Sequence, residues 1–210
     1  MRAIVVNELG GPEVMALREH PDPVAGPGQV VVQVAAAGGV GLLLTQMIKD
    51  LGGTVVATTS SPAKAALAKQ AGADFVTTYE DFPAAVSEVT GGRGADVVFD
   101  GVGQATFDAS LSALRPRGMM VLFGGSSGQV PPFDLQRLNS GGSLYVTRPT
   151  LAHYATDRTE LVWRASDIFE AIVKATLHVR VGAEYPLASA PRAHEDLAGR
   201  RTTGKLILVP

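Results

Sequence analysis

The stretch VVVQVAAAGGVGLLLTQMIKDLGG, residues 30–53, decides the fold. It begins as an apolar strand over residues 30–36, turns on glycines, and continues as an amphipathic helix over residues 40–51. A strand that passes through such a turn straight into a helix presents unpaired backbone N–H groups and the positive end of the helix dipole. The sequence therefore predicts an anion site, suited to a phosphate, beyond the end of this strand.

The glycines of the turn have separate expected roles. Gly38 and Gly39 are predicted to form the tight turn and to let a pyrophosphate approach the backbone, and Gly41 to let the helix pack close to the strand. Glycines are also common at strand-to-helix turns for geometric reasons alone, so the turn gains weight only inside a βαβ unit. The face of the helix predicted to pack on the sheet consists of Leu44, Met47, Ile48 and Leu51.

Apolar strands alternate with helical patterns along the chain after this stretch. Short buried strands separated by helices specify a parallel sheet with both faces covered. The predicted fold class is therefore α/β, with a Rossmann-type doubly wound parallel sheet. Strands are predicted near residues 54–58, 74–77, 95–100, 118–123 and 143–147, and helices near 62–71, 82–90 and 105–114.

The pattern differs on both sides of this region. Residues 2–6 and 14–17 are predicted to be short strands, and the Pro/Gly-rich segment HPDPVAGPGQ, residues 20–29, is a candidate boundary. Beyond residue 150 the pattern predicts a helix near 158–174, a strand near 177–187, a short helix near 191–200 and the closing segment KLILVP.

The second helix of the sheet region carries matching signals at both ends. Ser61 is placed to cap its N-terminus, Pro62 occupies the first helical position, and Gly72 follows its last turn. These signals fix the phase and direction of the helix independently of its apolar pattern.

The segment TVVATTSSPAK, at the end of the second strand of the sheet region, indicates which nucleotide is bound. A chain that binds NAD places Asp or Glu there to hold the ribose 2′-OH, but no acidic residue lies between Asp50 and Asp74. Ser60, Ser61 and Lys64 instead offer hydroxyls and an ammonium, which favour a 2′-phosphate that a carboxylate would repel. NADPH is therefore the predicted cofactor, although taken singly Ser61 is explained by the helix cap and Lys64 by a solvated side chain.

Composition excludes several other classes of function. A net charge of −2 gives no basis for binding nucleic acid or an anionic membrane, and the chain has no cysteine, so neither disulfides nor a thiolate zinc site can form. The four histidines lie without ligand spacing, so no metal site is expected. No apolar run suits a signal peptide or a membrane helix, so a cytoplasmic protein is expected.

Six segments carry a family likeness that covers nearly the whole chain: AAAGGVGLLLTQ, SSPAKAALAKQAGAD, DVVFDGVG, VLFGGSSGQVPPFD, SLYVTRPTL and AHEDLAGRRTTGKLILVP. Together they resemble the NADPH-dependent quinone oxidoreductases, the zinc-free branch of the medium-chain dehydrogenase/reductase superfamily. The resemblance implies a Rossmann domain beside a GroES-like catalytic domain. It also implies reduction of quinones or activated enones by hydride transfer from NADPH, commonly in a homodimer.

The resemblance also implies which residues contact the cofactor, while it leaves the catalytic residues unknown. The pyrophosphate would lie against the glycine turn, the 2′-phosphate beside the end of the second strand, and the nicotinamide beside the later strand ends. The implied residues are Gly38, Gly39 and Val40 for the pyrophosphate; Ser60, Lys64 and Tyr79 for the 2′-phosphate; Gly101, Phe123, Gly124, Gly125, Ser126, Thr147, Arg148 and Pro149 near the nicotinamide; and Arg200 at the far end. Core packing explains Phe123 equally well, and a surface cation would explain Arg148 or Arg200.

The glycine turn comes unusually early for this family. In the family, a strand like GPGQVVVQVAAAG continues into most of the catalytic domain, and a much later strand ends in AAAGGVG; here the two similar ends are fused. The predicted domains are residues 1–29, a remnant of the GroES-like N-terminal region; 30–149, the NADPH-binding Rossmann domain; and 150–210, a C-terminal remnant of the GroES-like domain. Most of the catalytic domain is expected to be missing, so turnover is expected to be impaired.

Several alternative functions follow from the same residues. The chain could hold NADPH, or only dimerise, without turnover. A methyltransferase is disfavoured because the second strand lacks a terminal acid, and a short-chain dehydrogenase because no tyrosine has a lysine four residues later. The segment GGSLYVTRP is predicted to be an edge strand that pairs with its symmetry mate in a homodimer.

Overall fold

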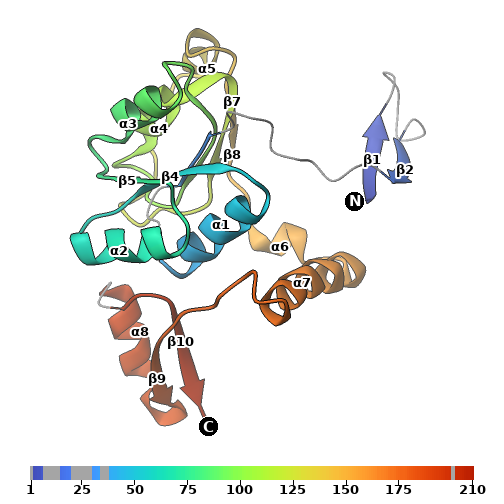
Figure 1. Ribbon diagram of the computed structural model, residues 1–210, viewed down its shortest axis with the longest axis vertical. Helices are drawn as coiled ribbons and strands as arrows, with labels where there is room; N and C mark the ends of the chain where they lie inside the picture. Colours follow the sequence, from blue (N-terminus) through green and yellow to red (C-terminus); the bar gives the residue numbers. More distant parts are fainter. Residues whose placement is uncertain (1, 7–14, 20–29, 34–37, 200–201) are drawn as a thin grey trace.

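A computed structural model describes residues 2–6, 15–19, 30–33, 38–199 and 202–210. Its centre is a six-stranded sheet in which every neighbouring pair of strands is parallel (Figure 1). Across the sheet the strands stand in the order β5 (Phe75–Thr77), β4 (Thr54–Thr58), β3 (Val30–Gln33), β6 (Ala95–Asp100), β7 (Leu114–Leu122) and β8 (Tyr145–Thr147).

The strand order confirms the predicted fold. β3 lies at the centre, with Val31 paired to Val55 of β4 on one side and to Val97 of β6 on the other. The chain runs outward from β3 to β5 and then crosses back to begin β6, which is the topology of dinucleotide-binding sheets. The strand predicted to be fused therefore occupies the central position of the sheet.

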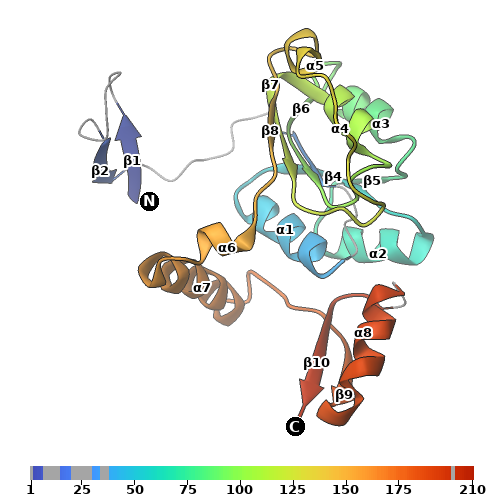
Figure 2. The same ribbon diagram turned by 180° about the vertical axis from the view of Figure 1, so that it is seen from behind.

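Four helices cover the two faces of the sheet, as Figures 1 and 2 show from opposite sides. On one face lie α1 (Gly39–Asp50) and α2 (Pro62–Gln70), and on the other lie α3 (Phe82–Val89) and α4 (Phe107–Ser112). Successive side chains of a strand point to opposite faces, so Val55 and Ala57 join the apolar cluster under α1 and α2, whereas Val56 joins the cluster under α3 and α4.

The predicted buried face of α1 was partly wrong. Ile48 is buried and Leu44 packs against the cluster, but Met47 and Leu51 are exposed. The buried side of the helix is formed instead by Gly41, Leu42, Thr45 and Ile48. A polar residue fits this side because the Thr45 hydroxyl donates to the carbonyl of Gly41 at 3.0 Å, so its burial leaves no unpaired donor.

The predicted ends of α2 are confirmed. The Ser61 side chain accepts from the backbone N–H of Lys64 at 3.4 Å, and Pro62 begins the helix. Gly72 follows with a φ of +98°, a left-handed conformation that other residues adopt at a cost. The N–H of Ala73 then donates to the carbonyl of Ala68, which closes the last turn. The helix therefore enters and leaves the sheet region at fixed points.

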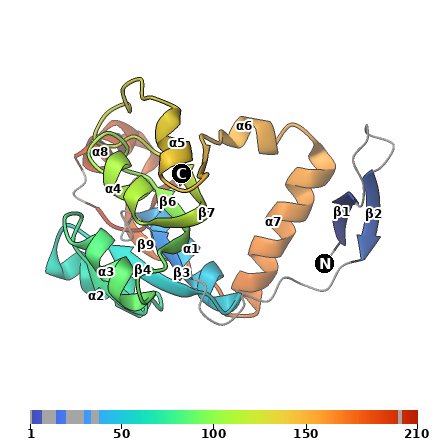
Figure 3. The ribbon, with the colours of Figure 1, turned by 90° about the horizontal axis from the view of Figure 1, so that it is seen from above.

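The elements after β8 lie outside the main sheet. Among them α6 and η2 were not predicted, and neither was α5, which precedes β8; β9 is shorter than the predicted strand 177–187. Figure 3 shows α7 to the side of the sheet layers, covering neither face. The element before β8 is α5 (Gln136–Ser140). The elements after β8 are α6 (Leu151–Tyr154), α7 (Arg158–Val173), β9 (Val181–Pro186), η2 (Leu187–Ser189), α8 (Ala190–Ala198) and β10 (Lys205–Val209).

Two small sheets accompany the main one. β9 and β10 pair in parallel, and at the other end of the chain β1 (Arg2–Val6) and β2 (Met15–Glu19) form an antiparallel pair. β2 ends two residues beyond the predicted strand 14–17. Within the described ranges, no helix combines the length and the apolar character needed to cross a membrane. The division into domains at residues 29 and 149 stays a prediction.

Candidate nucleotide-binding site

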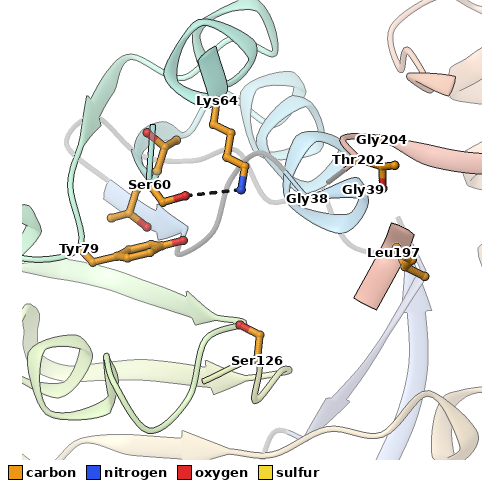
Figure 4. Close-up of a pocket in the computed structure, with 11 residues that line it drawn as sticks. Gly38, Gly39, Ser60, Lys64, Tyr79, Ser126, Leu197, Thr202 and Gly204 are labelled. Atoms are coloured by element: carbon orange, nitrogen blue, oxygen red, sulfur yellow. Dashed lines mark hydrogen bonds between the residues drawn. The ribbon is translucent and has the colours of Figure 1, made fainter. Parts of the chain in front are cut away.

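A pocket of about 250 Å³ opens beside the N-terminus of α1 and the end of β4 (Figure 4). We call it the glycine-turn pocket. Among the described residues that line it none is acidic and Lys64 is the one cation, so the pocket favours an anion. Its lining consists of Gly38, Gly39, Thr58, Thr59, Ser60, Lys64, Tyr79, Ser126, Leu197, Thr202 and Gly204.

Three of the predicted 2′-phosphate residues lie together on one side of this pocket. Ser60 follows β4, Lys64 lies in the first turn of α2, and Tyr79 follows β5. The Lys64 ammonium donates to the Ser60 hydroxyl at 3.4 Å, and Figure 4 shows the Tyr79 hydroxyl directed toward the same space. The cap at Ser61 fixes the first turn of α2 next to the end of β4, and this brings the Lys64 side chain to Ser60.

The glycine turn forms the adjoining wall. Leu42 donates the first hydrogen bond within α1, to the carbonyl of Gly38 at 3.1 Å, so the amides before it have no acceptor inside the helix. No acidic residue occupies the first turn of this 12-residue helix, which leaves its positive dipole end uncompensated there. These amides and Lys64 together provide donors suited to phosphate oxygens.

The structure gives a reason for glycine in the turn beyond the predicted approach of a pyrophosphate. Gly38 has a φ of −76° and is extended, a conformation open to any residue. The need for glycine comes at Gly39, where an added Cβ would lie 3.3 Å from the carbonyl oxygen of Gly204. Close approach of another chain segment, and not a left-handed backbone, therefore explains the absence of a side chain at this position.

The C-terminal part of the chain completes the pocket. Gly38 and Gly204 form a parallel bridge, and the Lys205 side chain lies within 3.5 Å of where a Gly39 Cβ would be. A second tie lies further along α1: the Gln46 amide accepts from the backbone N–H of His178 at 2.7 Å and donates to its carbonyl at 3.1 Å. These contacts bring Leu197, Thr202 and Gly204 to the glycine turn.

Five of the residues predicted near the nicotinamide, Gly101 and residues 123–126, lie at or just after the ends of β6 and β7. A Cβ on Gly101 would lie 2.8 Å from the ring of Phe123, and a Cβ on Gly124 would collide with the Gly101 backbone. These glycines therefore let two loops pack directly on each other. Ser126 lies on the second of the loops and lines the glycine-turn pocket, whereas Phe123 does not.

The remaining predicted residues lie outside the glycine-turn pocket or outside the described residues. Thr147 ends β8 and Pro149 follows it; between them, Arg148 donates to the carbonyl of Leu122 at 3.0 Å, which ties β8 to the end of β7. Val40 is exposed in the first turn of α1, and Gly41 is buried beneath it. Arg200 lies outside the described residues. Gly125 lies in the loop after β7, where its carbonyl accepts from the N–H of Gly128 at 3.0 Å.

A second hollow of about 530 Å³ adjoins the glycine-turn pocket along the ends of β4 and β5. The two share Thr59, Ser60 and Tyr79, and Ser61 lines the second hollow only. Together they follow the carboxyl edge of the sheet, where open parallel sheets bind their ligands.

Sequence reasoning missed five lining residues. Thr58 and Thr59 are buried hydroxyl residues at the end of β4, and the run ATTSS was the signal for them. Leu197, Thr202 and Gly204 come from the far end of the chain, and no local pattern connects them to the glycine turn.

Comparison with known proteins identifies the family. The family model described as zinc-binding dehydrogenase matches residues 39–161, which is more than half of the chain. The chain belongs to this family. The described residues bring no three His, Asp or Glu side chains together as a metal site, and the sequence has no cysteine. The part of the chain that the structure describes therefore offers no ligand set for the zinc of the family's description.

Individual relatives confirm the resemblance to quinone oxidoreductases. Quinone oxidoreductase 1 of Escherichia coli is 45% identical over 180 residues, 84% of this chain and 55% of the relative. A 2-haloacrylate reductase of Burkholderia is 40% identical over 187 residues, 88% of this chain and 56% of the relative. A mycobacterial protein solved in complex with NADPH is 50% identical with a TM-score of 0.83, covering 87% of this chain and 57% of that one. The chain thus spans a little over half the length of these relatives.

Proposed function

We propose that the chain binds NADPH along the carboxyl edge of its parallel sheet and, with reduced efficiency, donates hydride to a quinone or an activated enone. One observation carries the proposal: Lys64, Ser60 and Tyr79 converge in a pocket that has no acidic lining residue and adjoins the uncompensated N-terminus of α1. The mycobacterial relative solved with NADPH and the E. coli quinone oxidoreductase support the choice of cofactor and substrate class.

Each part of the cofactor has candidate partners in this chain. Lys64, Ser60 and Tyr79 would hold the 2′-phosphate, and the backbone of Gly38, Gly39 and Val40 would hold the pyrophosphate. Arg200 would contact the far end of the cofactor. The nicotinamide would lie beside the loops after β6, β7 and β8. When bound, NADPH supplies a hydride; the chain's own contribution is to orient the cofactor and to exclude water from it.

The short length of the chain relative to its relatives bears on the efficiency of hydride transfer. The chain spans 57% of the mycobacterial relative. Outside the main sheet, the described residues form two small two-stranded sheets and no larger β domain. Hydride transfer needs both reactants held close together and shielded from water, so an open cleft orients them poorly. This observation favours a second candidate, an NADPH-binding or dimerisation module without turnover.

Titration with NADPH and with NADH tests the cofactor. We expect NADPH to bind at least about tenfold more tightly, because charge-assisted hydrogen bonds to the 2′-phosphate contribute on the order of 1.5–3 kcal/mol each. Lys64→Ala should remove most of this preference, while Lys69→Ala, on the same helix but outside the pocket lining, should leave it unchanged. Equal affinity of the unaltered protein for both cofactors would contradict the proposal.

The same samples separate the two candidate functions. Quinone reduction measured per bound NADPH should fall well below that of a full-length relative, since each 1.4 kcal/mol of lost orientation costs about tenfold in rate. Binding with no turnover at all would favour the module, and turnover equal to a full-length relative would show that the pocket is complete without a further domain.

We also propose a homodimer that forms along β8, and a cytoplasmic location remains a prediction. β8 is the last strand of the sheet on its side, and Tyr145 is exposed there. A lysine on an edge strand opposes pairing with another strand, so Tyr145→Lys should shift a dimer toward monomer in light scattering. Phe75→Lys on β5, the opposite edge, is the matched control and should not change the mass. A monomeric unaltered protein at micromolar concentration would rule out this dimer.

A further inference from the structure

Asp100 is a fully buried carboxylate at the end of β6, and the proposed function gives it no contact with the cofactor. Its side chain accepts hydrogen bonds from two backbone amides, those of Val102 at 2.8 Å and Gly103 at 2.9 Å. It also accepts from the Thr106 hydroxyl at 2.9 and 3.0 Å and from the Ser110 hydroxyl at 2.9 Å. The charge is thus buried with its acceptor sites occupied, which is the condition under which proteins tolerate one.

The backbone of the same residue holds a second loop. Its carbonyl accepts from the N–H groups of Phe123 at 2.9 Å and Gly124 at 3.2 Å, directly after β7. Asp100 therefore joins two loops that are separate in the sequence: the loop 101–106, through its carboxylate, and the loop 123–128, through its carbonyl.

Further hydrogen bonds fasten the two loops to each other. The Ser127 hydroxyl donates to the carbonyl of Val102 at 2.8 Å and accepts from the N–H of Ala105 at 3.0 Å. The N–H of Ser126 donates to the carbonyl of Gly101 at 3.4 Å. Ser126 lines the glycine-turn pocket from a loop that carries none of Ser60, Lys64 and Tyr79 (Figure 4), so a change in loop 101–106 would reach the pocket on the Ser126 side.

We propose that Asp100 is a positioning residue for the nicotinamide half of the cofactor site, acting through loops 101–106 and 123–128. The inference rests on the proposed function, since it assumes that these loops face the nicotinamide. It predicts a division of the site: loss of the Asp100 carboxylate disturbs the loops after β6 and β7 and leaves Ser60, Lys64 and Tyr79 in place after β4, on α2 and after β5.

Asp100→Asn is the informative substitution. An amide has the shape of the carboxylate, and its oxygen can still accept from the N–H groups of Val102 and Gly103. Its NH₂ group would replace the oxygen that accepts from Thr106 and Ser110, so both hydroxyls would have to turn and accept instead. Charge-assisted hydrogen bonds thereby become weaker neutral ones, which loosens loop 101–106.

Asp96→Asn is the matched control. Asp96 lies at the other end of β6, where it pairs with Arg93 at 3.0 Å and with Arg115, and it lies outside both pockets. The hydrogen bond to Asp96 raises the pKa of Arg93, so the guanidinium stays charged. Both variants lose one strand aspartate, but only Asp100 holds the two loops.

Affinity for two probes, NADPH and adenosine 2′,5′-bisphosphate, is measured for each variant well below its unfolding temperature. The bisphosphate carries the adenosine, the 2′-phosphate and the first phosphate of the pyrophosphate, and it lacks the nicotinamide half. We expect Asp100→Asn to weaken NADPH at least about tenfold, equivalent to about 1.4 kcal/mol, and to change the bisphosphate by less than about twofold. Asp96→Asn should change neither affinity by more than about twofold.

Thr106 provides an independent series in case Asp100→Asn does not fold. Thr106→Val keeps the shape of the side chain and removes the hydroxyl donor to Asp100, and should weaken NADPH selectively; Thr106→Ser restores the hydroxyl and should restore affinity. Equal weakening of both probes, or unchanged NADPH affinity in the folded variants, would overturn the inference. If the unaltered protein bound NADPH no more tightly than the bisphosphate, the inference would be wrong, but the proposed adenosine site would remain supported. If it bound neither probe, the proposed function would be wrong as well.

Discussion

The sheet region and the C-terminal region treat their apolar side chains in opposite ways. Within the described residues, all buried hydrophobic side chains from residue 38 to 150 belong to the sheet strands, the helices on them or their loops, and only Leu177 and Ala193 are buried later. In the C-terminal region large apolar side chains face outward, among them Trp163, Phe169 and Val173 on α7. The sheet is closed by its own helices, whereas α7 has no such cover.

The difference teaches where the stability of the molecule resides. Burial of apolar surface is the main favourable contribution to folding, so the two clusters beneath α1–α2 and α3–α4 carry most of it. The C-terminal region is held instead by a few polar ties, such as the Gln46–His178 pair. Substitutions in the two regions should therefore differ in cost even when the residue type is the same.

The largest expected effect compares two phenylalanines. Phe82 on α3 is fully buried, so Phe82→Ala should lower the free energy of unfolding by about 3–5 kcal/mol through lost burial and a cavity. Phe169 on α7 is 64% exposed, so Phe169→Ala should cost less than about 0.5 kcal/mol. Urea unfolding followed by circular dichroism measures both. A similar loss for Phe169 would show that α7 is covered in solution, which would break the comparison.

A smaller effect compares two acidic residues with a lysine partner. Asp74 pairs with Lys49 at 2.9 Å and also accepts from the backbone N–H of Val55 at 2.8 Å, so it ties β4 to α1. Asp74→Ala should lower the unfolding free energy by about 1–2 kcal/mol. Glu170 on α7 pairs with Lys174, and both side chains are exposed, so Glu170→Ala should change the unfolding free energy by less than about 0.5 kcal/mol. Thermal unfolding at low and high salt measures both, and equal shifts would contradict the distinction.

The smallest effect tests the ties of the C-terminal region. Gln46→Ala removes both hydrogen bonds to the His178 backbone, which are exposed to solvent and together contribute on the order of 1 kcal/mol. Amide hydrogen exchange near His178 and Gly204 should accelerate about five- to tenfold, while exchange in β6 stays unchanged. Gln70 lines the same hollow as Gln46 and His178, but the hydrogen bonds to the His178 backbone come from Gln46, so Gln70→Ala serves as the control. If exchange accelerated equally in β6, the two regions would not be separate in stability.

Most of the sheet was predictable because its signals are local. β4 and β6 begin and end at the predicted residues, and α2 follows its cap at Ser61. The buried side of α1 was not predictable, because apolar residues surround most of the helix and the pattern does not fix its rotation. Burial of Thr45 depends on a hydrogen bond to Gly41 that only the folded helix reveals.

The site divides along the same line. Ser60 and Lys64 lie between the end of β4 and the first turn of α2, so the strand and helix boundaries indicated that they are neighbours. Tyr79 was indicated by the family resemblance alone. Leu197, Thr202 and Gly204 reach the pocket through contacts with α1 from the other end of the chain, and no local pattern indicates such contacts. Asp100 also escaped notice, although Thr106 and Ser110, four residues apart at helical spacing, were visible in the sequence.

The central position of β3 has a consequence for synthesis on the ribosome. One edge of this strand pairs with β4, which emerges soon after it, but the other edge must wait for β6, with Val31 paired to Val97. Until then the nascent chain carries an apolar Val-Val-Val strand with one unpaired edge, a site where other chains can pair. The same strand that completes the centre of the finished sheet is therefore the segment most in need of protection while the chain is being made.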